Sequence, residues 1–217
     1  MNTQNEKQII KISCADPSAL GLFGLAITTL VASSQKLGIT TGFSFVIPWA
    51  IFLGSLAQLI ACFNDAKNEN TFGATAFGAF AFFWLALATS WLFKMGVFGK
   101  QLAVVDGKQL GFAFLAYLIF CVYMTIGAME THKVLFMDFV FIDFLFIGLT
   151  LSSFNIGGEA TLKLAAYSEL AISIISFYGS AASVLNNHFG RVFLPVGKPF
   201  GIFKNSNFEQ VDKNVSR

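Results

Sequence analysis

The chain contains 217 residues, of which 55% are hydrophobic and 12% are charged, and its formal net charge is +2. A soluble globular domain carries about 25% charged residues, so this composition excludes an ordinary soluble enzyme. The small positive charge, with no basic cluster interleaved with aromatic residues, gives no indication of a nucleic-acid-binding protein.

Six stretches of the sequence are long and apolar enough to cross a membrane as helices. Four of them contain no charged residue: 19–35, 43–63, 71–93 and 110–129. Two more are apolar apart from two charged residues each: 134–154 and 162–185. A helix of about 20 residues spans the hydrocarbon core of about 30 Å. The sequence therefore predicts an all-α integral membrane protein with six transmembrane helices.

The distribution of basic residues predicts how the chain is oriented, because cytoplasmic loops carry an excess of Lys and Arg. With six crossings, nine of the 14 basic residues fall on the side of the two termini and five on the other side. We expect a multi-pass protein of the plasma (inner) membrane with both termini in the cytoplasm, and no removable signal peptide. The predicted division is a cytoplasmic N-terminal segment over 1–16, a six-helix transmembrane domain over 17–188 and a cytoplasmic C-terminal tail over 189–217.

The first predicted helix has a clear start. Asp16 followed by Pro17 is typical of an acidic N-cap and a proline at the first helical position. One turn further on, Gly21 and Gly24 leave a notch in the helix surface. Such a notch favours close packing against another helix over direct contact with a ligand.

Polar groups in the second and third predicted helices are candidates for a solute pathway. Gln58 is the only amide in 43–63, so it either bonds a neighbouring helix or faces an aqueous path. The third helix starts near Asn70 and Thr71 and is rich in small residues. If this start lies below the membrane surface, its free N–H groups and the positive end of the helix dipole predict a site for a small carboxylate.

Two acidic residues lie deep in the last two predicted helices. Asp143 is at the midpoint of 134–154, and Glu169 is about one turn from the midpoint of 162–185. A charge at the bilayer centre costs about 2.5 to 3.5 kcal/mol on insertion scales, so both side chains should face protein or water. One hypothesis is that Asp143 or Glu169 is protonated at neutral pH and exchanges a proton during transport. The alternative is a neutral acid that is hydrogen-bonded in a helix or subunit interface.

Patterns that carry enzymatic or cofactor chemistry are missing from the sequence. No Walker loop, G-x-S-x-G elbow or clustered Cys/His spacing occurs. Cys14, Cys62 and Cys121 are far apart, and we interpret them as small buried residues rather than as a disulfide or metal ligands. We therefore expect no enzyme activity, no cofactor and no metal.

A stripe of small residues on the last predicted helix suits either contacts between subunits or packing inside one protomer. The stripe consists of Ser173, Ser176, Gly179, Ala182 and Ser183.

Three blocks of the sequence resemble the acetate uptake transporter family, and the similarity runs from about 15 to 197. The first block is 16–22 (DPSALGL); the second combines 54–58 (GSLAQ), 70–77 (NTFGATAF) and 83–84 (FW); the third is 185–197 (LNNHFGRVFLPVG). The resemblance implies a six-helix protomer that assembles as a hexamer, with one pathway through each protomer. It also implies passage of acetate and similar short monocarboxylates.

Members of this family have a hydrophobic constriction made by bulky side chains from the first, third and fifth helices. Matching outward from the three blocks puts Leu25, Phe80 and Ile142 at these places. A constriction of this kind excludes water and bare ions while it passes a small amphipathic acid. For a solute that takes this route, we expect capture near Asn70 and Thr71, then partial dehydration beside Gln58, and then crossing of the constriction.

Asp16 departs from the family signature, which has an asparagine at this place. Asparagine can donate hydrogen bonds to a carboxylate, whereas an ionised aspartate can only accept them. We include Asp16 among the candidates for the substrate pathway, where it is protonated or paired with a cation; the alternative is that it is only a helix cap.

The leading hypothesis is a channel or proton-linked carrier for acetate and similar short-chain monocarboxylates, with succinate as a further candidate substrate. Its expected partners are the carboxylate, protons, membrane lipid and further copies of the chain in a hexamer. One alternative is the transport of ammonia or another small neutral solute. Another is a non-transporting membrane sensor with the same fold.

Overall fold

The computed structural model describes residues 15–203, and its helices account for all six predicted membrane spans. The helical segments are α1 (Ser18–Lys36), α2 (Val46–Trp49), the π-helix η1 (Ala50–Ala57), α3 (Gln58–Lys67), α4 (Thr71–Lys94), α5 (Gly107–Ala128), α6 (Lys133–Ser153) and α7 (Gly158–Phe189). Because α2, η1 and α3 continue one another, six helices are long and apolar enough to cross a membrane. Residues 15–203 contain no strand. The predicted all-α fold with six transmembrane helices is confirmed.

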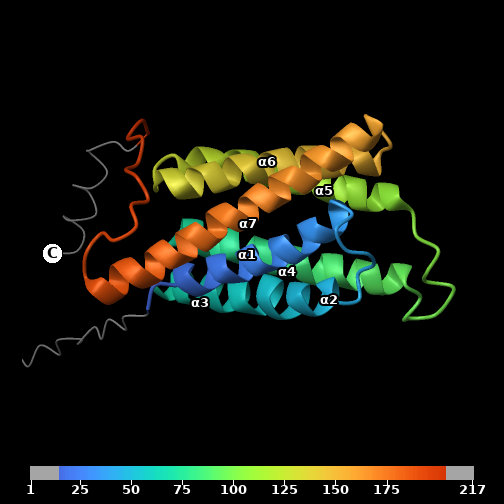
Figure 1. The fold of residues 1–217 in the computed structure, drawn as a ribbon, viewed down its shortest axis with the longest axis horizontal. Coiled ribbons are helices and arrows are strands. Elements are labelled where there is room, and N and C mark those ends of the chain that lie inside the picture. Colours follow the sequence, from blue (N-terminus) through green and yellow to red (C-terminus); the bar gives the residue numbers. More distant parts are fainter. Residues whose placement is uncertain (1–14, 204–217) are drawn as a thin grey trace, which may run out of the picture.

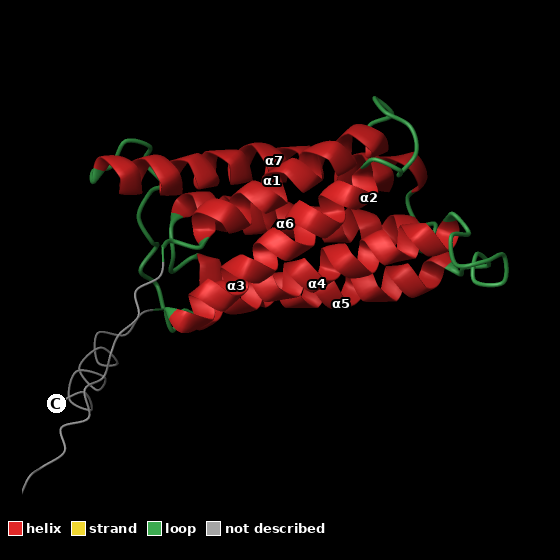
Figure 2. Cartoon of the chain, turned by 90° about the horizontal axis from the view of Figure 1, so that it is seen from below, coloured by secondary structure: helices red, strands yellow, loops and turns green. Residues whose placement is uncertain are grey.

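The helices run along the long axis of the molecule, and α7 crosses obliquely past α1 and α6 (Figure 1). α7 packs extensively against both of these helices, α6 packs against α5, and α3 packs against α4. In the view turned by 90°, α7 and α1 lie on one side and α4 and α5 on the other (Figure 2). α6 contacts both α7 and α5, so it connects these two sides of the bundle.

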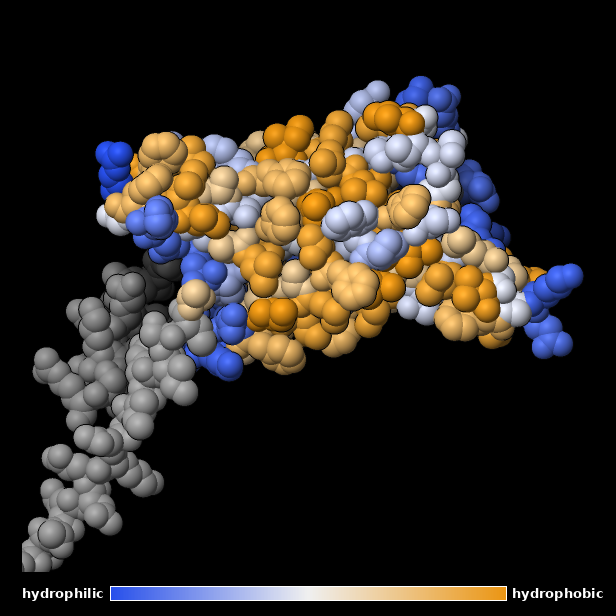
Figure 3. Space-filling view, turned by 60° about the horizontal axis from the view of Figure 1, so that its bottom comes forward, coloured by the Kyte–Doolittle hydropathy of each residue, from blue (hydrophilic) through white to orange (hydrophobic). Residues whose placement is uncertain are grey.

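On the face shown in Figure 3, hydrophobic residues predominate along the middle of the bundle, and the most hydrophilic residues lie at its two ends. Large hydrophobic side chains such as Phe52, Phe82 and Ile119 are exposed on the helices. In water such a surface would cause association, whereas in a bilayer it faces lipid chains. The distribution therefore fits a chain that is embedded in a membrane.

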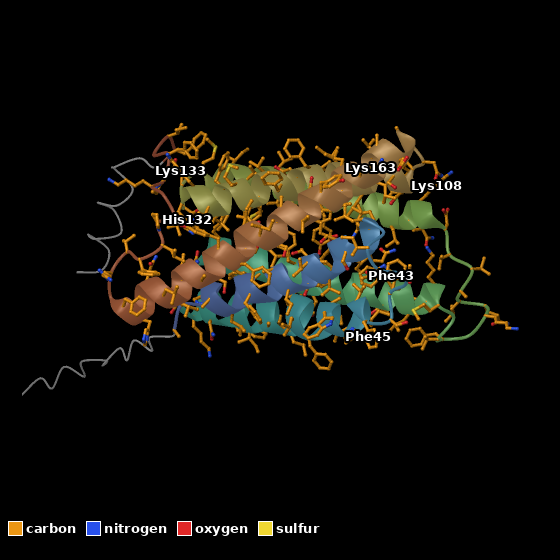
Figure 4. The ribbon with its side chains drawn as sticks, in the orientation of Figure 1. Phe43, Phe45, Lys108, His132, Lys133 and Lys163 are labelled. Atoms are coloured by element: carbon orange, nitrogen blue, oxygen red, sulfur yellow. The ribbon has the colours of Figure 1, made fainter. Side chains whose placement is uncertain are left out.

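The two ends of the bundle differ in which segments they carry. The termini end holds the start of α1, the end of α7, and His132 and Lys133 at the start of α6 (Figures 1 and 4). The loop end holds Phe43, Lys108 and Lys163 (Figure 4). Residues 1–14, which include Cys14, and residues 204–217 lie outside the described range; they belong to the two predicted terminal segments.

Glycines in α1 allow close approach of other helices. A side chain at Gly21 would collide with the ring of Phe77 in α4, and one at Gly24 would collide with the carbonyl oxygen of Leu53 in η1. The notch predicted from these two glycines is therefore a packing surface.

The small-residue stripe of α7 packs inside the protomer. Ser173 Oγ donates a hydrogen bond of 2.8 Å to the carbonyl oxygen of Ala26 in α1. Gly179 lies against Leu22 of the same helix, where an added Cβ would be 2.9 Å from a methyl carbon. These contacts favour the second of the two roles expected for the stripe.

Candidate functional site

A cavity of about 200 Å³ opens toward the termini end of the bundle, between α1, α3, α4 and α6. We call it the first cavity. Its apolar wall includes Leu22, Leu25, Phe72, Phe77, Phe80, Leu135, Phe139 and Ile142. Its polar wall consists of Ser18, Gln58, Asp65, Asn70, Thr131, His132 and Asp138. Five of the residues selected from the sequence thus meet in one cavity, namely Leu25, Gln58, Asn70, Phe80 and Ile142.

A second cavity, of about 410 Å³, lies nearer the loop end. Its wall contains Gln35, Lys36, Gly38, Phe43, Phe83, Leu87, Trp91, Leu110, Phe114, Leu145, Leu149, Leu162 and Glu169. α1, α4 and α6 contribute to both cavities. On α4, Phe80 belongs to the first cavity and Phe83 to the second, one turn later, and Ile142 and Leu145 repeat this step on α6. The two cavities therefore lie end to end along the same three helices.

The three predicted constriction residues stand where the two cavities approach each other. Leu25, Phe80 and Ile142 are all buried, and they belong to one hydrophobic cluster that also includes Phe83. The ring of Phe80 lies 6.2 Å from that of Phe139 and 6.0 Å from that of Phe120, measured between centroids. We call Leu25, Phe80 and Ile142 the neck. The three side chains are apolar, so they offer no polar group that could replace the hydration shell of an ion.

Several oxygen atoms in the polar wall of the first cavity lack a hydrogen-bond partner within residues 15–203. Gln58 Nε2 donates a hydrogen bond of 2.8 Å to the carbonyl oxygen of Gly54, whereas Gln58 Oε1 has no donor. Asp138 Oδ2 accepts a hydrogen bond of 2.8 Å from Ser176 Oγ, and Asp138 Oδ1 has no hydrogen-bond partner. Buried oxygens without donors are costly, so this wall is suited to a solute or water that donates hydrogen bonds.

The start of α4 is already occupied by groups of the protein. Asn70 Oδ1 accepts a hydrogen bond of 3.2 Å from Gly73 N, and Asn70 Nδ2 donates a hydrogen bond of 2.7 Å to Asp65 Oδ1. Asp65 Oδ2 lies so close to Gly73 that a side chain there would collide with it. The carboxylate of Asp65 therefore takes much of the favourable interaction with the helix dipole that the sequence suggested for a bound carboxylate. Thr71 lies outside the cavity wall, at the exposed first residue of α4.

His132 caps α6 at the mouth of the first cavity. Its Nδ1 accepts a hydrogen bond of 3.1 Å from Leu135 N, so this nitrogen carries no proton. Burial lowers the pKa of His132, and the Asp16 carboxylate opposes this effect. The imidazole is therefore held in its neutral form, with its other nitrogen available as a donor.

Asp16 acts as a cap and a link between helices. Its Oδ1 accepts a hydrogen bond of 2.9 Å from Ser18 N. Its Oδ2 accepts hydrogen bonds from Ser183 Oγ and Asn187 Nδ2 of α7. Among the roles left open by the sequence, these contacts favour the helix cap. Asp16 does not line either cavity.

The two acids selected for a proton role lie in different environments. Asp143 Oδ2 accepts 2.7 Å from Thr125 Oγ1 of α5, and Asp143 lines neither cavity. Glu169 Oε2 pairs with Lys36 Nζ at 2.8 Å in the wall of the second cavity. They therefore do not act on each other as a pair.

Asp65, Asp138, His132 and Lys36 line the cavities, although the sequence did not single them out. For Asp138 the available signal was an acid inside the apolar run 134–154, but the choice of the acid at the midpoint favoured Asp143. Lys36 ends the first apolar run and has the sequence pattern of an ordinary loop lysine.

Six helices long and apolar enough to span a membrane, with two cavities that lie end to end along α1, α4 and α6, define a membrane channel or transporter for a small solute. The chain belongs to the GPR1/FUN34/yaaH family, whose sequence pattern matches residues 1–198. It is 32% identical over 186 residues to the succinate-acetate/proton symporter SatP of Escherichia coli, and this similarity covers 85% of the chain and 96% of that protein. The family predicted from the sequence blocks is confirmed.

A solved structure supports the same relationship. The bacterial acetate channel SatP matches the fold with a TM-score of 0.79 at 29% identity, covering 85% of this chain and 99% of the other. Acetate permease A of Emericella nidulans is 27% identical over 197 residues, which cover 84% of this chain and 65% of that protein. Ammonia transport outward protein 2 of Saccharomyces cerevisiae is 30% identical over 175 residues, which cover 78% and 61%. The chain spans less than two thirds of these two fungal proteins.

Proposed function

We propose that the protein carries acetate and similar short-chain monocarboxylates across the membrane, as a channel or proton-linked carrier, with succinate as a larger candidate substrate. The observation that carries this proposal is the apolar neck between two cavities in a chain of this family. In this proposal Leu25, Phe80 and Ile142 line the way between the two cavities, where their apolar side chains suit a methyl group and disfavour a hydrated ion. The names of the bacterial relative and of the fungal acetate permease support the same substrate class.

In this proposal each polar residue of the first cavity has a separate task. Asn70 stands exposed at the mouth, where a solute first meets the protein. Gln58 lies deeper and is fully buried, so it can hold a partly dehydrated acid before the acid reaches the neck. Asp138, also buried, is the acid best placed to exchange a proton with a solute in this cavity. Asp143 and Glu169 remain candidates for proton exchange outside it.

The same proposal assigns no enzymatic activity and no cofactor to the protein. We assign transport to 17–188 and cytoplasmic positions to 1–16 and 189–217, in the plasma (inner) membrane. The described ends of the chain lie at one end of the bundle, as this orientation requires (Figure 1). A hexamer with one pathway in each protomer is the assembly that we propose, and native mass measurement in detergent tests it.

Uptake of labelled acetate into proteoliposomes tests the function, with protein-free vesicles measuring free diffusion of acetic acid. The pH gradient and the membrane potential are varied separately. The expected result is acetate uptake that exceeds the background and is inhibited by excess propionate. Faster uptake when the side of acetate addition is acidic supports proton linkage. Background uptake under every gradient contradicts acetate as the substrate.

Ammonium transport is a second candidate, because the first cavity is rich in acceptors. Gln58 Oε1, Asp65 Oδ2 and Asp138 Oδ1 are all buried and lack donors among residues 15–203. Ammonium offers donors to such a wall, and one fungal relative is named for ammonia transport. Uptake of labelled methylammonium by the same proteoliposomes, in the absence of acetate uptake, is the result that favours this candidate.

A further inference from the structure

The second cavity holds a buried ion pair whose two residues come from distant parts of the sequence. Lys36 Nζ, at the end of α1, lies 2.8 Å from Glu169 Oε2 in α7. The side chains of Lys36 and Glu169 are 14% and 2% exposed. They are the only charged residues in the described wall of this cavity.

The surroundings of this pair are apolar and aromatic. Phe43 stacks on Trp91 with a centroid distance of 5.1 Å, and Phe83 and Phe114 complete an aromatic wall. Electrostatic interactions are stronger in such surroundings than in water. A carboxylate with a short hydrocarbon group matches this cavity, because its charge can meet Lys36 while its methyl group contacts the rings.

Stability alone is a weak reason for an ion pair at this place. The cost of removing two charges from water often exceeds their attraction, and apolar residues of similar size can replace a buried pair without loss of stability. The neighbouring pair Glu159 and Lys163, 2.9 Å apart on the exposed face of α7, does not line the cavity. It provides a matched comparison for a pair without a ligand-binding role.

Lys36 retains donors for a ligand. An ammonium group has three N–H donors, and Glu169 Oε2 is its one protein acceptor within residues 15–203. Lys36 follows Leu25 of the neck by eleven residues, which corresponds to about 16 Å along a helix. A group at this distance acts on the capture of a solute rather than on its passage through the neck.

We propose that Lys36 binds the substrate carboxylate in the second cavity, and that Glu169 is a built-in competitor for the same ammonium group. This inference rests on the proposed carboxylate transport. Substrate binding displaces Glu169 Oε2 from Lys36 Nζ, and release of the substrate restores the pair. The strength of the internal pair thereby sets the affinity of the site.

The competitor role predicts effects of opposite sign for the two residues. Lys36→Met removes the binding cation, so the apparent KM for acetate rises by about tenfold or more, the loss expected for a charged hydrogen bond. Glu169→Gln weakens the competitor, so the apparent KM falls several-fold. In the double variant Lys36→Met/Glu169→Gln the KM equals that of Lys36→Met, because competition requires the ammonium group. The maximal rate changes less than KM in all three.

The test measures the concentration dependence of labelled acetate uptake in proteoliposomes, together with calorimetric acetate binding to the purified protein in detergent. Glu159→Gln and Lys163→Met serve as controls and leave KM unchanged. If Lys36→Met alone fails to fold, Lys36→Met/Glu169→Met, in which no charge is left unpaired, carries the expected loss of affinity.

A purely structural pair gives a different outcome: Glu169→Gln and Lys36→Met both lower folded yield, and neither shifts KM in the stated direction. That result overturns the inference while wild-type uptake leaves the proposed function standing. Acetate binding that depends on Lys36, without wild-type uptake, overturns the proposed function and supports the site.

Discussion

Asn70 Nδ2 donates a 2.7 Å hydrogen bond to Asp65 Oδ1, while Asn70 Oδ1 accepts from Gly73 N. One amide therefore caps α4 and also holds a carboxylate against the first turn of the same helix. The amide is exposed, whereas Asp65 is buried in the wall of the first cavity. This arrangement makes Asn70 part of the fold and part of the cavity mouth.

Substitution of Asn70 separates these two tasks. Asn70→Ala removes the cap and the donor to Asp65, and we expect a loss of about 1 kcal/mol of stability together with reduced acetate uptake. Asn70→Asp keeps a capping oxygen but places a second carboxylate beside Asp65, so uptake falls while the cap survives. Thermal unfolding in detergent and initial uptake rates measure the two effects. An unchanged unfolding temperature in Asn70→Ala contradicts the capping role.

The size of the neck is expected to set the upper limit for the substrate. Phe80→Ala enlarges the passage, so uptake of succinate rises relative to uptake of acetate. Loss of the buried ring also costs about 3 to 5 kcal/mol, and Phe80→Leu offers a milder change if the alanine variant does not fold. Phe82→Ala is the control, because Phe82 lies on the same helix and is 60% exposed. An unchanged ratio of succinate to acetate in both Phe80 variants removes this residue from the neck.

The helices could be predicted from the sequence, whereas the polar partners could not. Long apolar runs specify membrane helices by themselves, and the family blocks placed Leu25, Phe80 and Ile142. The pairs Ser176 with Asp138 and Lys36 with Glu169 join residues 38 and 133 positions apart. Which groups meet over such separations depends on how the helices pack, and no local pattern encodes it.

The same reason explains why the depth of an acid in the membrane does not show whether its side chain faces a cavity. Asp143 lies at the midpoint of its apolar run but bonds Thr125 of α5 away from both cavities. Asp138 lies five positions earlier in α6, and this shift turns its side chain to the first cavity. Facing direction, set by the rotation of the helix in the bundle, decides which acid meets a solute.

Asp138 is therefore expected to influence the pH dependence of uptake more than Asp143. Asp138→Asn keeps an oxygen that accepts from Ser176 but removes the group that exchanges a proton, so uptake loses its acceleration by an inward acidic gradient. Asp143→Asn leaves this acceleration in place. The measurement is acetate uptake with and without the gradient at matched membrane potential. Acceleration that persists in Asp138→Asn, Asp143→Asn and Glu169→Gln alike rules out a proton role for these acids.

We expect the folded protein to lose stability in acid because of the environment of His132. Burial lowers the pKa of His132, so the unfolded chain takes up a proton more readily than the folded one as pH falls through about 6.5. The stabilising effect of the neutral ring is present above that pH and is lost below it, because protonated Nδ1 cannot accept from Leu135 N. His132→Asn keeps a capping acceptor without this titration, so its unfolding temperature in detergent falls less than that of the wild type between neutral and mildly acidic pH. His188→Asn, at an exposed position near the end of α7, retains the wild-type decrease. An equal decrease in all three proteins shows that another group causes the acid sensitivity.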